Sequence, residues 1–96
     1  MGNVRLSHLA DKDLDAIRDY LRPQNPRAAD DLLERIYDTL ESLAEQSEMG
    51  ERREDLGQNL RAFVVRPYVV FYYPAVEGIH VARIIHGARD FPAIFG

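Results

Sequence analysis

Apolar residues recur with helical spacing in the first half of the chain and form dense strand-like runs in the last third. Steps of three and four residues, which place side chains on one face of a helix, predict helices over 7–22 and 25–45. The apolar faces consist of Ala10, Leu14, Ile17 and Leu21 in the first helix and of Ala29, Leu32, Leu33, Ile36, Leu40 and Leu43 in the second. Each helix therefore has one face for a core and one for solvent.

Capping residues indicate where these helices begin and end. Ser7 and Asn25 are favourable N-caps because their side-chain oxygens can accept hydrogen bonds from free backbone N–H groups. Pro26 suits the first helical position, whereas Pro23 disfavours a helical conformation beyond Arg22. Only a few residues separate the two helices, so we expect an antiparallel αα-hairpin.

Strand-forming residues dominate the rest of the sequence. Four strands are predicted, at 4–6, 60–66, 68–74 and 79–86. A hairpin turn is expected at 75–78, and the polar segment 46–59 is predicted to be a surface loop. The order of elements predicts an α+β fold, β-α-α-β-β-β, in a single domain of residues 1–96.

The central strand, 68–74, is apolar on both faces. Side chains alternate along a strand, so Val69, Phe71 and Tyr73 face one side and their neighbours face the other. One helical hairpin can cover only one side of the sheet. The second side therefore needs cover from the apolar tail at 91–95, from another chain, or from both, because large exposed apolar patches usually mark partner sites.

Composition and charge narrow the function classes. The 96 residues carry a net charge of −4 and 12 basic side chains, of which only Lys12 is a lysine. Proteins that bind the nucleic acid backbone usually have a basic excess, so we do not expect sequence-specific DNA binding by this chain alone. The sequence has no cysteine, no apolar run near the roughly 20 residues that span a membrane, and no secretory signal. A cytoplasmic protein without membrane association is predicted.

The last predicted strand ends in a polar cluster of His86, Arg89 and Asp90. In a functional interpretation, Arg89 binds a phosphate or carboxylate and His86 acts as an acid or base. In the structural alternative, His86 only ends the strand, while Asp90 pairs with Arg89 or caps the tail. Arg61 and Arg83 lie within apolar runs, where a structural salt bridge is favoured over contact with a substrate.

No other pattern in the sequence indicates catalysis. The 3 histidines lack metal-ligand spacing, and we find no Ser–His–Asp arrangement, phosphate-binding loop or pair of catalytic carboxylates. We therefore predict no catalytic residue, no metal and no cofactor.

An ordered set of short motifs resembles a known family. The motifs are Leu6-Ser7, Asp13-Leu14, Asn25-Pro26, Ala28-Ala29, Met49-Gly50, Leu60-Arg61, Tyr68-Val69-Val70-Phe71-Tyr72 and Ile84-Ile85-His86-Gly87-Ala88-Arg89-Asp90. With these motifs the chain resembles the ParE toxins of the ParE/RelE superfamily, the toxic halves of type II toxin–antitoxin modules. The resemblance covers almost the whole chain, and its most specific motif is the His-Gly-Ala-Arg-Asp run after the last strand.

The resemblance implies a fold, a partner and a target class. The implied fold is an αα-hairpin packed on a small, mainly antiparallel sheet. The implied partner is a ParD-type antitoxin, with which the toxin would form a hetero-oligomer. ParE-type members poison DNA gyrase, whereas RelE-type members cleave mRNA in the ribosomal A site.

The residues favour a gyrase poison over a nuclease. Aligning the strands with RelE places its two lysines at Ala62 and Val64, one arginine at Val69 and its tail tyrosine near Phe95, so only Arg89 keeps its basic type. Cleavage of RNA needs a group that activates the 2′-hydroxyl and cations for the phosphate. We expect inhibition of gyrase without enzymatic activity; an mRNA interferase and a non-toxic binding module are the alternatives.

Two contact surfaces are expected. Contact with the target is expected at the end of the last strand and in the tail, through His86, Arg89, Asp90, Phe91 and Phe95. Contact with the antitoxin is expected through Tyr20, Tyr37, Arg61, Tyr68, Tyr72 and Arg83. In this prediction, the two arginines pair with acidic residues of an amphipathic antitoxin segment.

Overall fold

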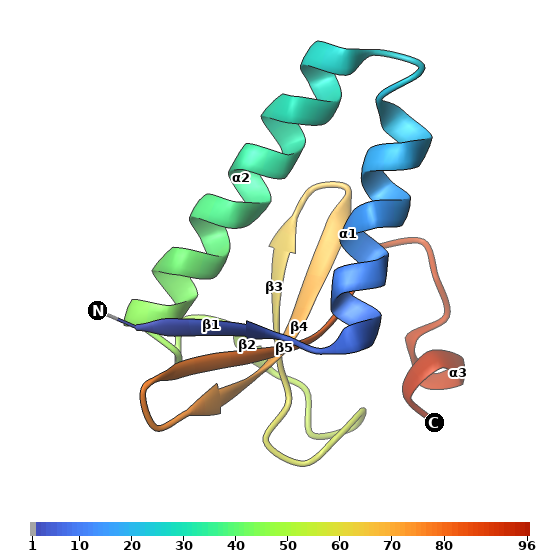
Figure 1. Ribbon diagram of the computed structural model, residues 1–96. Coiled ribbons are helices and arrows are strands. Elements are labelled where there is room, and N and C mark those ends of the chain that lie inside the picture. Colours follow the sequence, from blue (N-terminus) through green and yellow to red (C-terminus); the bar gives the residue numbers. More distant parts are fainter. Residues whose placement is uncertain (1) are drawn as a thin grey trace.

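The computed structural model describes residues 2–96 as a helical hairpin followed by most of a sheet (Figure 1). The elements are β1 (Asn3–Leu6), α1 (His8–Leu21), α2 (Pro26–Glu45), β2 (Glu51–Arg52), β3 (Arg61–Val65), β4 (Tyr68–Ala75), β5 (Gly78–His86) and α3 (Phe91–Phe95). No helix in this part of the chain is long and apolar enough to cross a membrane. The predicted α+β class is confirmed, and β2 and α3 are additions to the predicted order of elements.

Both long helices begin where the sequence predicts. The Ser7 hydroxyl oxygen accepts a hydrogen bond from the Ala10 N–H at 2.9 Å, and the Asn25 side-chain oxygen accepts one from the Ala28 N–H at 3.1 Å. These caps satisfy backbone donors that have no partner within the helix. The predicted apolar faces are buried, except that Leu21 at the end of α1 is half-buried.

The sheet has the strand order β1-β5-β4-β3-β2. β1 lies parallel to β5, whereas the other three pairs are antiparallel. β2 pairs with β3 at two positions, Glu51 with Ala62 and Arg52 with Arg61. Two polar residues carry no alternating pattern, so the prediction of a surface loop over 46–59 missed this strand.

One extra residue in β5 changes the direction of side chains in the middle of the sheet. Phe71 pairs with Arg83, and the next residue of β4 pairs with Val81, so Ala82 has no partner in β4. Such a β-bulge shifts the alternation of side chains by one position. As a result, Val81 and Ile84 both pack into the core beneath the helices, and Arg83 can reach α1 from between them.

Two apolar clusters hold the layers together. The larger lies between the helical hairpin and the sheet and includes Val70 and Tyr72 of β4. The smaller lies on the second side of the sheet. Its buried residues and the side chains that pack on them are Leu60, Val69, Phe71 and Ile85, with Leu56, Phe91, Ile94 and Phe95. The expectation that the tail packs back on the sheet is confirmed, and the tail does so as the short helix α3.

Candidate functional site

The polar end of β5 lies against the first residue of β4. Tyr68 and His86 are direct partners across this antiparallel pair, and their rings meet edge to face with centroids 5.4 Å apart at 78°. Tyr68 is half-buried and His86 is exposed. Burial raises the pKa of the Tyr68 hydroxyl, and the neighbouring Tyr20 of α1 raises it further. Tyr68 is therefore a neutral hydrogen-bonding group at physiological pH.

A short turn fixes the backbone after β5. The Gly87 N–H donates to the Pro67 carbonyl at 2.8 Å, which ties this turn to the connection between β3 and β4. The Nδ1 atom of His86 accepts a hydrogen bond from the Ala88 N–H at 3.1 Å. This hydrogen bond holds the His86 ring at the end of β5.

Arg89 and Asp90 have different roles in this turn. The Asp90 carboxylate accepts a hydrogen bond from the Ala93 N–H at 3.3 Å and caps α3. The Arg89 side chain is exposed and forms no ion pair within residues 2–96. Asp90 therefore caps the tail helix and does not pair with Arg89. The Arg89 guanidinium can offer its donors to an external carboxylate or phosphate.

Phe91 and Phe95, predicted to contact the target, hold α3 against β4. Their rings meet the buried Phe71 ring edge to face, with centroid distances of 4.9 and 4.8 Å. Arg53 adds a cation–π contact, with its guanidinium carbon 6.0 Å from the centre of the Phe91 ring. Both phenylalanines are half-buried, so each has a core side and a partly exposed side.

Tyr72, predicted to contact an antitoxin, is instead a core residue. It has 0% exposure, and its hydroxyl donates to the Ser47 carbonyl at 2.8 Å and accepts from the Gly50 N–H at 2.9 Å. The alternation of β4 directs Tyr72 toward the helices, where a partner cannot reach it. Tyr20 and Tyr37 of the helical hairpin are 68% and 42% exposed. These two aromatic side chains are accessible to a partner.

Arg83, also in the predicted antitoxin set, forms an internal ion pair. Its Nε and Nη2 atoms donate to the two carboxylate oxygens of Asp13 at 2.8 and 2.9 Å, and the Ile84 N–H donates to the same carboxylate at 2.9 Å. The side chains of Arg83 and Asp13 are only 23% and 15% exposed. The hydrogen bond to Asp13 raises the pKa of Arg83. This is the structural salt bridge favoured by the apolar sequence around Arg83, and it occupies the guanidinium.

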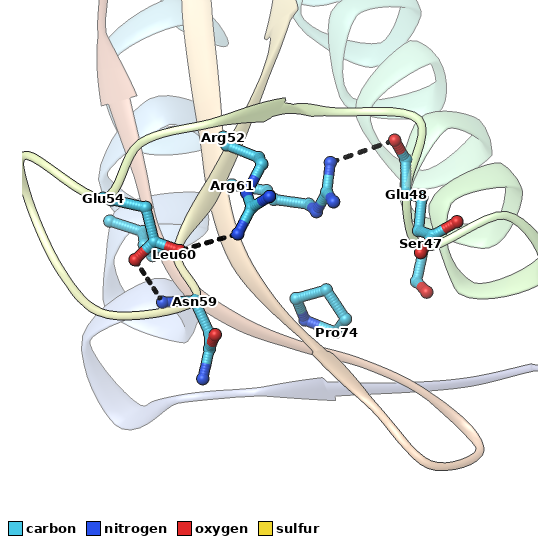
Figure 2. A pocket seen from close by; sticks show the side chains of 8 residues that line it. All are labelled: Ser47, Glu48, Arg52, Glu54, Asn59, Leu60, Arg61 and Pro74. Atoms are coloured by element: carbon cyan, nitrogen blue, oxygen red, sulfur yellow. Dashed lines mark hydrogen bonds and ion pairs between the residues drawn. The ribbon is translucent and has the colours of Figure 1, made fainter.

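Arg61 lies in a polar pocket of about 210 Å³ beside β2 and β3 (Figure 2). Its guanidinium donates to two backbone carbonyls of the loop after α2. These are the carbonyls of Glu48, at 3.1 Å, and of Gly50, at 2.7 Å. Next to it, Arg52 pairs with Glu54 at 3.2 Å, and Glu54 also accepts the Asn59 N–H at 3.0 Å. The bonds from Asn59 and Arg52 lower the pKa of Glu54. Arg61 therefore anchors the connection between α2 and β3.

The end of the sheet that precedes the turn with Arg89 is apolar at two positions where the resemblance places cations of RelE. Val64 pairs with Val69, and Val69 pairs with Ile85. Val64 is 57% exposed, whereas Val69 is buried. Within residues 2–96, no three histidine, aspartate or glutamate side chains meet in a way that could hold a metal ion. This end of the sheet can bind an anionic group through Arg89 and His86.

Comparisons with known proteins agree with this fold. Residues 4–91 match the family described as ParE toxin of type II toxin-antitoxin system, parDE. "Toxin RelE2" of Caulobacter vibrioides is 42% identical over 89 residues, which cover 93% of this chain and 99% of that protein. "Toxin ParE3" of the same organism is 31% identical over 97 residues, covering 100% of this chain and 97% of that protein. A solved structure, "Chromosomal ParDE TA system from P. aeruginosa", has a TM-score of 0.74 at 21% identity over 90% of this chain and 96% of that chain, which shows a shared fold.

Proposed function

The chain belongs to the ParE toxin family of type II toxin–antitoxin systems, and we propose that it poisons DNA gyrase and is neutralised by a ParD-type antitoxin. Membership of this family implies an antitoxin partner. The names of the relatives include both RelE and ParE, so the choice of gyrase rests on the residues of this chain. The proposed target places its action in the cytoplasm.

The choice of gyrase over mRNA is supported by the apolar residues at this end of the sheet. Cleavage of mRNA requires cations that neutralise the phosphate and a group that activates the 2′-hydroxyl. Ala62, Val64 and Val69 supply neither, although the resemblance places RelE cations at these positions. The net charge of −4 also opposes the approach of RNA. An exposed arginine at the same end of a sheet as an exposed apolar side chain, here Val64, is typical of a surface that binds another protein.

We propose that the turn from His86 to Asp90 contacts gyrase. Arg89 is exposed there and can form a forked hydrogen bond with a carboxylate or phosphate. The Asp90 cap and the packing of Phe91 and Phe95 hold this turn against the sheet. In this proposal Arg89 and His86 touch the target, and the residues of α3 position them.

We propose that the antitoxin neutralises the toxin by covering its exposed aromatic side chains. Tyr20 and Tyr37 are exposed on the helical hairpin, and the half-buried Tyr68 lies at the end of β4, near Tyr20. An amphipathic antitoxin segment could bury these rings with its apolar face. Tyrosine suits such a surface because it offers a large apolar ring and a polar hydroxyl.

Expression in cells without the antitoxin tests the proposed target. Incorporation of labelled thymidine and labelled methionine, measured soon after induction, reports DNA synthesis and protein synthesis separately. We expect DNA synthesis to stop first while translation continues, and co-expression of the antitoxin to restore growth. Early loss of translation would support an mRNA interferase instead, and unimpaired growth would support a non-toxic binding module.

A further inference from the structure

The second side of the sheet is only partly covered by the chain itself. α3 and the loop before β3 pack over Val69, Phe71 and Ile85. A groove of about 590 Å³ lies on the rest of this side, between β1, the start of α1, the middle of β5 and α3. Figure 1 shows α3 standing apart from the helical hairpin, joined to β5 by an irregular segment. The residues from His86 to Asp90 do not line the groove.

Three strands place a polar row along the floor of this groove. Arg5 of β1 pairs with His80 of β5, and His80 pairs with Tyr73 of β4. Val4 and Ile79, the preceding residues of β1 and β5, pack into the helix-facing core. Because side chains alternate along a strand, Arg5 and His80 face the opposite side, together with Tyr73. We call this feature the Arg5–His80 groove.

The basic groups of the row are free to bind an anion. Arg5 and His80 are exposed, and neither forms an ion pair with any carboxylate of residues 2–96. This is so although the chain carries 16 acidic side chains against 12 basic ones. Arg5 is a permanent cation whose planar guanidinium favours a forked bond to a carboxylate. The floor of the groove therefore complements a negatively charged group.

The walls of the groove are apolar. Leu6 and Leu9, from the junction of β1 and α1, are 37% and 53% exposed. Ile94 and Phe95 of α3 also line the groove and are half-buried. A ligand that fits must combine carboxylates for the floor with apolar side chains for the walls. A nucleic acid fits less well, because the groove offers few cations and the whole chain is acidic.

We propose that the Arg5–His80 groove binds an acidic and apolar segment of the antitoxin, an inference that rests on the proposed function. A carboxylate of this segment pairs with Arg5, and its apolar side chains pack on Leu9 and Phe95. This contact is additional to the one proposed on the aromatic residues of the helical hairpin. It also covers part of the second side of the sheet, for which the two-sided apolar pattern of β4 predicts cover from the tail, from another chain, or from both.

Charge reversal in the full-length toxin tests the groove. Arg5→Glu should weaken binding of the ParD-type antitoxin at least about tenfold, because an acidic segment would then face a like charge. Arg27→Glu is the matched control, since Arg27 is an exposed arginine at the start of α2 and does not line the groove. The dissociation constant of the control should match that of the unchanged toxin. Circular dichroism establishes that both variants are folded.

Hydrogen exchange of the unchanged toxin gives a second measurement that does not depend on a variant. Binding of the antitoxin should slow exchange of backbone amides in 5–9 and 94–95. The groove assignment would be overturned if Arg5→Glu and Arg27→Glu bound the antitoxin with equal affinity. It would also be overturned if the complex formed and the amides in these segments stayed unprotected. Either result would leave the proposed function intact. If the unchanged toxin forms no complex, both fail. Short duplex DNA that bound through Arg5, with antitoxin affinity unaffected, would also overturn the assignment.

Discussion

Arg89 is the residue on which the proposed toxicity depends most. Its guanidinium is exposed and has no ion-pair partner within residues 2–96, so Arg89→Ala should change the free energy of unfolding by less than about 0.5 kcal/mol. We expect the variant to fold and to bind the antitoxin, but to lose toxicity. Urea unfolding, antitoxin binding and growth after induction measure the three properties.

The control for Arg89 is Arg27→Ala, which removes an exposed arginine at the start of α2. This variant should remain toxic. A folded Arg89→Ala protein that still stops growth would move the target contact to another part of the turn or to α3. An unfolded one would assign Arg89 a structural role.

The ion pair between Asp13 and Arg83 should contribute to stability. Arg83→Met leaves the Asp13 carboxylate, only 15% exposed, without its cation, and should lower the free energy of unfolding by about 1–3 kcal/mol. A double-mutant cycle with Asp13→Asn, measured by urea unfolding, should give a coupling free energy of about 0.5–3 kcal/mol. Strictly additive effects of the two substitutions would show that the pair contributes nothing.

At the scale of elements, long periodic patterns could be predicted from the sequence. The helical faces and the caps at Ser7 and Asn25 are local properties, so α1 and α2 begin where expected. β2 and α3 could not be predicted, because their stability comes from contacts with distant residues. β2 exists through pairing with β3, and the five residues of α3 pack on Phe71.

The candidate site shows the same division between local and distant information. His86, Arg89 and Asp90 lie within five consecutive residues, so their cluster could be predicted from the sequence. The contact of Tyr68 with His86 depends on the strand register, and the ion pair of Arg83 depends on a bulge. The Arg5–His80 groove requires β1 to lie parallel to β5, which no local pattern encodes.

α3 should stabilise the fold by covering Phe71. The Phe95 ring is half-buried, so Phe95→Ala should lower the free energy of unfolding by about 1–3 kcal/mol, less than the ~3–5 kcal/mol of a fully buried ring. Chemical denaturation measures the loss. Val76→Ala, at a fully exposed position in the turn between β4 and β5, is the control. Equal stabilities of the two variants would contradict a covering role for α3.

In the whole molecule, the two sides of the sheet differ in what covers them. The helix-facing side buries the larger core and supplies most of the apolar packing. The second side is divided among α3, the surface beside Arg89 and the Arg5–His80 groove. With the proposed target contact at the end of β5 and the proposed groove beside β1, the antitoxin would bind the folded toxin without disturbing its core.

Binding of the antitoxin should raise the stability of the whole toxin. A ligand of the native state adds about 2.7 kcal/mol at a free concentration of 100 times its Kd. We therefore expect the Tm of the toxin to rise with antitoxin concentration in a thermal melt. A Tm that stays constant at concentrations where a complex is detected by size-exclusion chromatography would contradict binding to the folded state alone.

Cleavage of plasmid DNA by gyrase tests whether this toxin poisons the enzyme. The purified toxin is incubated with gyrase, ATP and supercoiled plasmid, and the products are separated before and after protease treatment. We predict linear DNA with gyrase covalently attached, in an amount that increases with toxin, disappears with antitoxin and falls with Arg89→Ala. Unchanged supercoiling without linear DNA, together with ribosome-dependent cleavage of mRNA by the same preparation, would contradict it.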